Sequence, residues 1–210
     1  MMTPEAFVGP ATPLAPADLA AAAAQLQVSL ARVRAVDEVE SRGRGFHPES
    51  RRPIILFEPH VFSRRTQHRF DASHPEVSYP TWNTRPYPPS QAQRYAQLFA
   101  AMALDETEAL KSASWGRFQI MGLNHAAAGF PTVQAFVAAM VKGEGEQMGA
   151  FARFVLANPG LLAALRTGDW AGFARLYNGP NFAAHGYDQK LKVAYARALS
   201  ATAQAGLGAA

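Results

Sequence analysis

The chain has 210 residues, of which 49% are hydrophobic, so it can bury one sizeable core and a single domain is expected. The absence of cysteine excludes disulfides, thiolate metal sites and a catalytic thiol. The net charge of +4, without extended Lys/Arg blocks, favours an anionic partner such as nucleic acid, a membrane surface or an acidic cell-wall polymer, and does not choose among them.

Residues 1–16 contain four prolines and little periodicity, so we predict a flexible leader. The leader lacks the positive start and apolar core of a secretory signal, and the uncharged stretch Leu19–Leu30 is too short to span a bilayer. We therefore expect a soluble protein made in the cytoplasm, which needs another route out if it acts outside the cell.

A long first helix is predicted from Asp18 up to the glycines at 43 and 45. Its apolar stripe is formed by Leu19, Leu26, Leu30, Val33 and Val36. At 100° per residue Glu40 lies on that stripe, Asp37 lies near it, and Glu38 points away. Burying an unpaired charge costs on the order of several kcal/mol, so a carboxyl at this place indicates chemistry.

The next segment is predicted to be a short β-hairpin or three-stranded flap beside that helix. It consists of residues 45–48, a polar turn at 49–52, and the apolar run 53–60. Residues 71–90 are rich in Pro, Tyr, Trp and Asn, which predicts an ordered loop and excludes a helix.

The remainder is predicted to be helical almost throughout, with Ser90 and Asp105 as caps. The expected helices cover residues 91–104, 106–112, 132–141, 144–156, 161–166, 169–177 and 187–203. The predicted fold class is mainly α (α+β), a helical domain at 17–203 with a small β flap after its first long helix and a short tail at 204–210.

Three segments carry a family resemblance: VESRGRGF at 39–46, SASWGRFQIMG at 112–122 and ARLYNGPNF at 174–182. A Glu-Ser pair at a helix end, a Gly-x-x-Gln segment and a Tyr-Asn-Gly segment resemble goose-type lysozymes and soluble lytic transglycosylases. Together with RPIILFEPHVF they resemble more closely the phage-type N-acetylmuramidase endolysins, over about residues 18–197. The resemblance implies a lysozyme-like fold and hydrolysis of the β-1,4 bond between N-acetylmuramic acid and N-acetylglucosamine in peptidoglycan.

Glu40 is the predicted general acid, because a poorly solvated carboxyl has a raised pKa and keeps a proton for the leaving sugar oxygen. The alternative is a helix-end residue paired with Arg42 or Arg44. Glu58, just past the apolar strand, is the predicted second carboxylate, which the flap would carry across a cleft from Glu40 to hold or deprotonate water. Its alternative is a strand-end residue bridged to an arginine.

Glu49 in the hairpin turn is a weaker rival for the second carboxylate, and Asp37 is weaker still. If the reaction inverts the sugar centre, the two carboxyls must lie about 6.5–9.5 Å apart.

Five further residues are predicted to bind substrate. Gln119 and Trp115 would form a wall, with Gly116 allowing a sugar or the catalytic helix to approach, although Trp115 is equally suited to the core. Ser41 would bind either the helix end or the substrate. The resemblance implies that the Tyr177 hydroxyl approaches the catalytic carboxyl and that Asn178 contacts the sugar or fixes the loop; the alternative is a simple turn.

No metal or cofactor is expected, because Pro59 separates Glu58 from His60 and no HExxH helix is present. A serine nucleophile is not expected either, since no GxSxG segment occurs.

Three alternatives concern the function as a whole. A lytic transglycosylase would use Glu40 as both acid and base. A nucleic-acid-binding domain would use the arginines at 42, 44, 51, 52, 64 and 65, although Glu40 and Glu58 beside them would repel phosphate. The helix at 187–203 either docks on the core or contacts a membrane.

The expected partner is the peptidoglycan glycan strand, bound by a monomer in the periplasm after release from the cytoplasm. Weak contact of the basic surface with an anionic outer membrane is also expected. Residues 1–16 leave no room for the peptidoglycan-binding repeats that many relatives carry.

Overall fold

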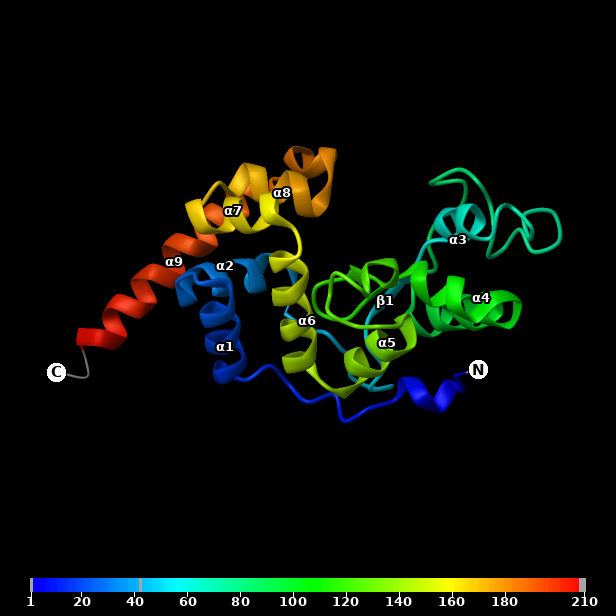
Figure 1. Ribbon diagram of the computed structural model, residues 1–210, viewed down its shortest axis with the longest axis horizontal. Helices are drawn as coiled ribbons and strands as arrows, with labels where there is room; N and C mark the ends of the chain where they lie inside the picture. Colours follow the sequence, from blue (N-terminus) through cyan, green and yellow to red (C-terminus); the bar gives the residue numbers. More distant parts are fainter. Residues whose placement is uncertain (1, 42, 208–210) are drawn as a thin grey trace. The chain divides into compact units, whose positions relative to one another are not determined.

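The structure is a computed structural model that describes residues 2–41 and 43–207. This described part is mainly helical with one small antiparallel sheet (Figure 1), which confirms the predicted fold class. Its helices are α1 Pro16–Leu26, α2 Leu30–Glu40, α3 Pro59–Arg65, α4 Gln91–Lys111, α5 Val133–Lys142, α6 Glu144–Leu156, α7 Pro159–Thr167, α8 Trp170–Asn178 and α9 Tyr187–Leu207. Its strands are β1 Ile55–Phe57, β2 Ala113–Trp115 and β3 Ile120–Met121, with 3₁₀ helices at Pro4–Phe7, Gly122–Asn124 and Pro180–His185.

The chain divides into two compact units. Unit 1 contains Met1–Pro13 and Arg44–Gln147, and unit 2 contains Leu14–Gly43 and Met148–Ala210. The sheet and α3 to α5 belong to unit 1, whereas α1, α2 and α7 to α9 belong to unit 2.

In unit 2 the predicted single first helix is two helices. Gln27 adopts a left-handed φ of 55° and its N–H bonds back to Ala23 and Ala24, which ends α1 before α2 begins at Leu30. The apolar stripe survives the break, since Leu26, Val33 and Val36 remain buried. The prediction of one helix was wrong because the same spacing continues across the interruption.

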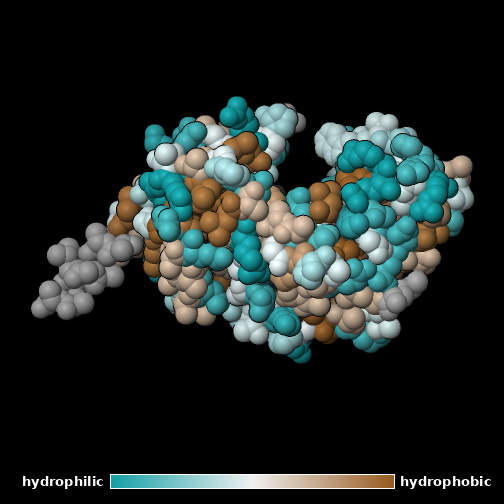
Figure 2. All heavy atoms as spheres, in the orientation of Figure 1, coloured by the Kyte–Doolittle hydropathy of each residue, from teal (hydrophilic) through white to brown (hydrophobic). Residues whose placement is uncertain are grey.

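Helix α9 packs along α2 (Figure 1), and its Leu191 and Ala194 are fully buried. This packing fits the docked alternative for residues 187–203. Hydrophobic residues also reach the surface along α9 (Figure 2), where Val193 is 57% exposed. Among the described residues no single helix has the length and hydropathy to cross a membrane, and the pair α6 and α7, which together would, bends by 102°.

In unit 1 strand β1 pairs with a distant partner. Ile55 faces Trp115 in antiparallel register, and Trp115 faces Ile120. The predicted hairpin at 45–60 is reduced to an isolated bridge between Phe46 and Pro53. The extended run stops at Phe57, because Pro59 occupies the first turn of α3, a position that favours helix initiation.

The segment expected to be a flexible leader packs on unit 1. Phe7 is fully buried, and its ring stacks on Trp115 with 5.9 Å between centroids and an interplanar angle of 14°. The Glu144 N–H donates to the Thr12 carbonyl at 2.9 Å, which fixes the strand-like end of this segment.

Helix α4 contains the predicted interruption. Asp105 has a non-helical φ of −158° and ψ of 97°, and its Oδ1 accepts a hydrogen bond from the Glu108 N–H at 3.0 Å. The Ser90 hydroxyl accepts from the Gln93 N–H at 3.2 Å. Both predicted caps are therefore confirmed.

A buried polar network joins the segments that flank the sheet. Glu144 accepts hydrogen bonds from the Arg117 guanidinium at 2.9 Å and from the Gly45 N–H at 2.5 Å. The Gln147 side-chain oxygen accepts from the Arg117 N–H at 2.6 Å. Gly116 has a φ of 68°, and a Cβ there would lie 2.5 Å from the Gln147 side chain. We expected a sugar or the catalytic helix to approach the backbone at Gly116. The group that approaches it is the Gln147 side-chain amide.

We expect Gly116→Ala to destabilise the protein more than Gly186→Ala does. Both glycines have a positive φ, 68° and 62°, but a Cβ at Gly186 meets nothing within 4 Å. The difference in free energy of unfolding, from urea titration, should be about 1–3 kcal/mol, the usual cost of overpacking. Equal losses would show that the close packing of Gln147 on Gly116 contributes nothing.

Candidate active site

Glu40 is the last residue of α2 and is half-buried. Asn178, the last residue of α8, donates a hydrogen bond from Nδ2 to the Glu40 Oε1 at 2.9 Å. Gly179 ends α8 with a φ of 82°, a conformation that glycine adopts without strain. Unit 2 therefore brings together the two sequence segments, Glu-Ser and Tyr-Asn-Gly, that the family resemblance had linked.

Tyr177 lies within an aromatic cluster, close enough to the same carboxyl to be affected by its charge. Its ring stacks on Phe173 with centroids 5.7 Å apart and meets Phe151 edge-on at 5.8 Å. Burial raises the pKa of the Tyr177 phenol well above its usual value, and the negative charge of Glu40 raises it further. The phenol therefore stays protonated and can donate a hydrogen bond throughout the neutral range.

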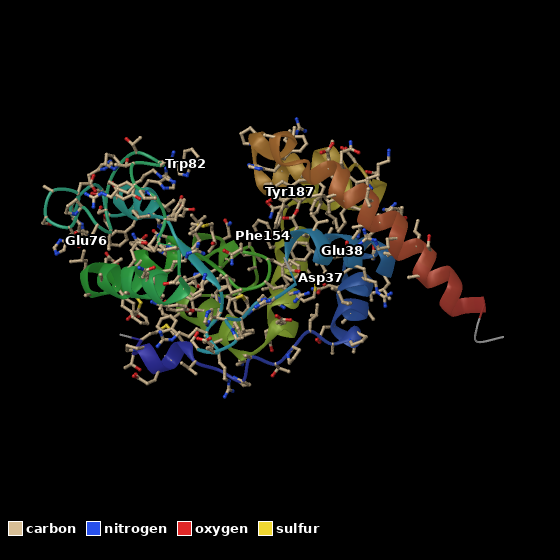
Figure 3. All side chains as sticks on the ribbon, turned by 180° about the vertical axis from the view of Figure 1, so that it is seen from behind. Asp37, Glu38, Glu76, Trp82, Phe154 and Tyr187 are labelled. Carbon is tan, nitrogen blue, oxygen red and sulfur yellow. The ribbon has the colours of Figure 1, made fainter. Side chains whose placement is uncertain are left out.

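The other residues at this helix end have structural partners. Ser41 is buried, and its hydroxyl accepts a hydrogen bond from the Gly43 N–H at 3.0 Å, which is the capping alternative. Glu38 is exposed on α2 and pairs with Arg197 of α9 at 2.6 Å; Figure 3 labels it beside Asp37, which is half-buried. Arg42 lies outside the described residues.

Glu58 is the N-cap residue of α3 in unit 1, and its side chain is 16% exposed. The Tyr87 hydroxyl donates to Glu58 Oε2 at 2.5 Å, and the His60 Nδ1 lies 3.4 Å from the same oxygen. Burial raises the pKa of the Glu58 carboxyl, and the hydrogen bond from Tyr87 offsets part of this rise. The described partners of Glu58 are therefore the Tyr87 phenol and the His60 imidazole. The alternative interpretation, in which Glu58 forms a salt bridge with an arginine, is not what these contacts show.

The side chains of Tyr87 and His60, which contact Glu58, are neutral. Burial and the carboxylate of Glu58 raise the pKa values of both Tyr87 and Tyr79. Burial, and then the charge of Arg64, lower the pKa of His60, so this imidazole carries no charge near neutral pH. Tyr79 and Tyr87 were not predicted as site residues. The richness of the loop at 71–90 in Tyr and Trp is the sequence signal that could have indicated them.

Two predicted wall residues differ in accessibility. Gln119 is exposed at the turn between β2 and β3, with a left-handed φ of 48°; its amide accepts from the Ser114 hydroxyl at 2.9 Å and donates to the Gly116 carbonyl at 2.7 Å. Trp115 is only 1% exposed, and its indole donates to the Leu110 carbonyl at 3.1 Å. A ring so enclosed belongs to the core, so we do not place Trp115 on the substrate-binding surface.

The remaining predictions concern Glu49 and metal binding. Glu49 is exposed at a hollow of about 270 Å³ that is lined by His47, Glu49, Ser50, Arg52, Gln91, Ala92 and Tyr95. It therefore lacks the burial that distinguishes Glu58. Within residues 2–41 and 43–207 no group of three or more His, Asp or Glu side chains could hold a metal ion.

Two arginines of the basic segment have partners inside unit 1. Arg52 lies over the Tyr95 ring, 5.1 Å from its centroid, and Arg65 pairs with Glu108. Their pairing within the fold weakens the case for a nucleic-acid surface.

A mainly helical fold with half-buried carboxyl groups held by neutral donors matches the class of carboxylate-dependent glycoside hydrolases. Residues 29–199 match the family model described as Muramidase, N-acetylmuramidase. The crystal structure of the Burkholderia AP3 phage endolysin is similar at a TM-score of 0.85 and 46% identity, over 92% of this chain and 73% of that chain. No curated protein matches. The chain belongs to the N-acetylmuramidase family, whose members are glycoside hydrolases of peptidoglycan, and the predicted resemblance is confirmed.

The raised pKa of Glu58 predicts a pH-dependent stability effect of Glu58→Gln. Because the folded-state pKa lies above the unfolded value, the stabilising contribution of this carboxyl is present at low pH and is lost as the pH rises through the folded pKa. The difference in melting temperature, Glu58→Gln minus wild type, should therefore be more positive at about pH 8 than at about pH 4. The measurement is thermal denaturation at both pH values, with the exposed Glu49→Gln as control. The same difference from wild type at both pH values would contradict the raised pKa.

Proposed function

We propose that this protein is an endolysin that lyses bacterial cells by hydrolysing the β-1,4 bond between N-acetylmuramic acid and N-acetylglucosamine. The observation that carries the proposal is the Asn178–Glu40 hydrogen bond near the half-buried Tyr177, in a chain of the N-acetylmuramidase family. The similar Burkholderia protein, described as a phage endolysin, supports the biological role.

Glu40 is the proposed general acid. It passes its proton to the glycosidic oxygen while the bond from that oxygen to the anomeric carbon breaks, and positive charge develops on the sugar ring. The Asn178 amide offers both a donor and an acceptor, so it can partner the carboxyl in either protonation state. The Tyr177 phenol, which stays protonated, adds a further fixed donor nearby.

Glu58 is the proposed base. Water forms a bond to the anomeric carbon and loses its proton to the ionised Glu58 carboxylate. Tyr87 and His60 both contact Oε2, so Oε1 is the oxygen we assign to the water. Burial raises the pKa of Glu58 and makes its carboxylate a stronger base than an exposed glutamate.

The proposed substrate contacts are Gln119, which is exposed, and Asn178, which is half-buried. Ser41 is a weaker candidate because its hydroxyl caps the end of α2. We further propose that residues 17–203, which contain all of these side chains, are the catalytic part, and that the protein acts as a monomer.

The positive net charge of the chain assists the enzyme in reaching its substrate. We propose that the protein is released from the host cytoplasm and reaches peptidoglycan in the periplasm, where the net charge of +4 aids approach to anionic wall polymers and gives weak contact with an anionic outer membrane.

We expect Glu40→Gln and Glu58→Gln each to lose at least about two orders of magnitude in turnover on purified peptidoglycan, the size typical of removing a general acid or base. Glu38→Gln, an exposed neighbour on the same helix, is the matched control and should keep wild-type turnover. Circular dichroism of all three variants checks that folding is unchanged.

The products separate hydrolysis from its rival. Mass spectrometry of the muropeptides should show reducing ends. Products with 1,6-anhydro ends, together with normal turnover by Glu58→Gln, would identify a lytic transglycosylase in which Glu40 serves as both acid and base.

A further inference from the structure

The long loop between α3 and α4 exposes a tryptophan. Trp82 is 61% exposed, whereas the other two tryptophans of the chain, Trp115 and Trp170, are 1% and 8% exposed. Figure 3 shows Trp82 on this loop of unit 1. A single exposed aromatic ring is common on protein surfaces, so its meaning depends on what holds it.

Trp82 lies near Tyr87. The Trp82 indole is close enough to the Tyr87 phenol to influence its pKa, and the Tyr87 hydroxyl donates to Glu58 Oε2 at 2.5 Å. The turn that carries Trp82 is fixed by a hydrogen bond of 2.6 Å from the Thr84 hydroxyl to the Thr81 carbonyl and by the left-handed Asn83, with a φ of 61°. The exposed ring therefore lies on an ordered turn, near the phenol that binds the Glu58 carboxyl.

An exposed aromatic ring with one polar N–H and an otherwise apolar surface suits a ligand that has both apolar and polar groups. Sugar rings are such ligands, because their C–H faces are apolar and their hydroxyl and acetamido groups are polar. The exposed Asn83, Thr84 and Arg85, which follow Trp82 in the loop, supply donors and acceptors for those groups.

We propose that Trp82 is a saccharide-binding platform on which one sugar of the peptidoglycan glycan strand stacks, beside Glu58. The proposal rests on the proposed function and names a substrate contact within unit 1. Tyr87 lies between the two parts of this site, since it binds Glu58 and is near the indole of Trp82.

Tryptophan fluorescence tests the platform directly, because Trp82 is the one exposed tryptophan among the three, all of which are described. In Glu40→Gln, which should bind without cleaving, acrylamide quenching should fall when soluble glycan strands are added to saturation. Glu40→Gln combined with Trp82→Phe should show little quenching with or without the strands. Calorimetry on the same samples measures binding independently.

Kinetics provide the second test. Trp82→Ala should raise KM on soluble glycan strands about fivefold, because one aromatic contact contributes about 1 kcal/mol, while kcat changes little. Trp82→Phe should keep part of the affinity because it keeps a flat ring. Leu123→Ala, another exposed apolar side chain of unit 1, is the matched control and should leave KM unchanged.

Two results would overturn the platform: strands that bind Glu40→Gln without reducing acrylamide quenching, or an unchanged KM in Trp82→Ala. Protection of Trp82 by anionic lipid vesicles but not by glycan strands would also overturn it, in favour of a membrane contact. A normal rate in Glu58→Gln with Trp82 still protected by strands would instead refute the base assignment and leave the platform standing.

Discussion

The buried ion pair between Arg117 and Glu144 is the contact on which unit 1 depends. Both side chains are about nine-tenths buried, at 9% and 10% exposure, and desolvating two such charges costs several kcal/mol in order of magnitude unless further hydrogen bonds complete the site. The Gly45 N–H donates such a hydrogen bond to the Glu144 carboxylate, and the Arg117 N–H donates to the side-chain oxygen of Gln147. Gly45 then accepts from the Ile54 N–H at 2.9 Å, and the Ile54 carbonyl accepts from Gly116 at 2.8 Å. The ion pair thus sets the start of β1, and the end of β1 sets the position of Glu58.

The two candidate catalytic carboxyls are held by different chemistry. An amide can donate to a carboxylate or accept from a carboxylic acid, so Asn178 suits a group such as Glu40 that must lose and regain a proton in each cycle. A phenol with a raised pKa is a persistent donor, so Tyr87 favours the ionised form of Glu58 while burial opposes it. Carboxyls in contrasting surroundings are the usual basis for dividing acid and base roles.

The sequence pattern predicted local features well and distant pairings poorly. The bounds of α6 and the interruption at Asp105 follow from capping residues and periodicity within a few positions, and both were predicted. The break at Gln27 was missed because the apolar spacing is the same on either side. The partner of β1 was missed because it lies about 60 residues further along the chain, a separation at which alternation says nothing about pairing. Tyr87 was missed for the same reason, since only the fold brings a loop residue to Glu58.

The neutrality of the side chains that contact Glu58 bears on why this residue can serve as a base at all. An arginine in the place of Tyr87 would lower the pKa of the carboxyl and weaken it as a proton acceptor. Burial with a phenol and an uncharged imidazole has the opposite effect, because it keeps the carboxylate basic at the expense of folding free energy. The Glu58 side chain makes no capping hydrogen bond to α3, so a structural role as the cap of this helix does not explain why a destabilising buried carboxyl is present. One of its oxygens is occupied by Tyr87 and His60. The carboxyl is well explained as a group that must take a proton from water.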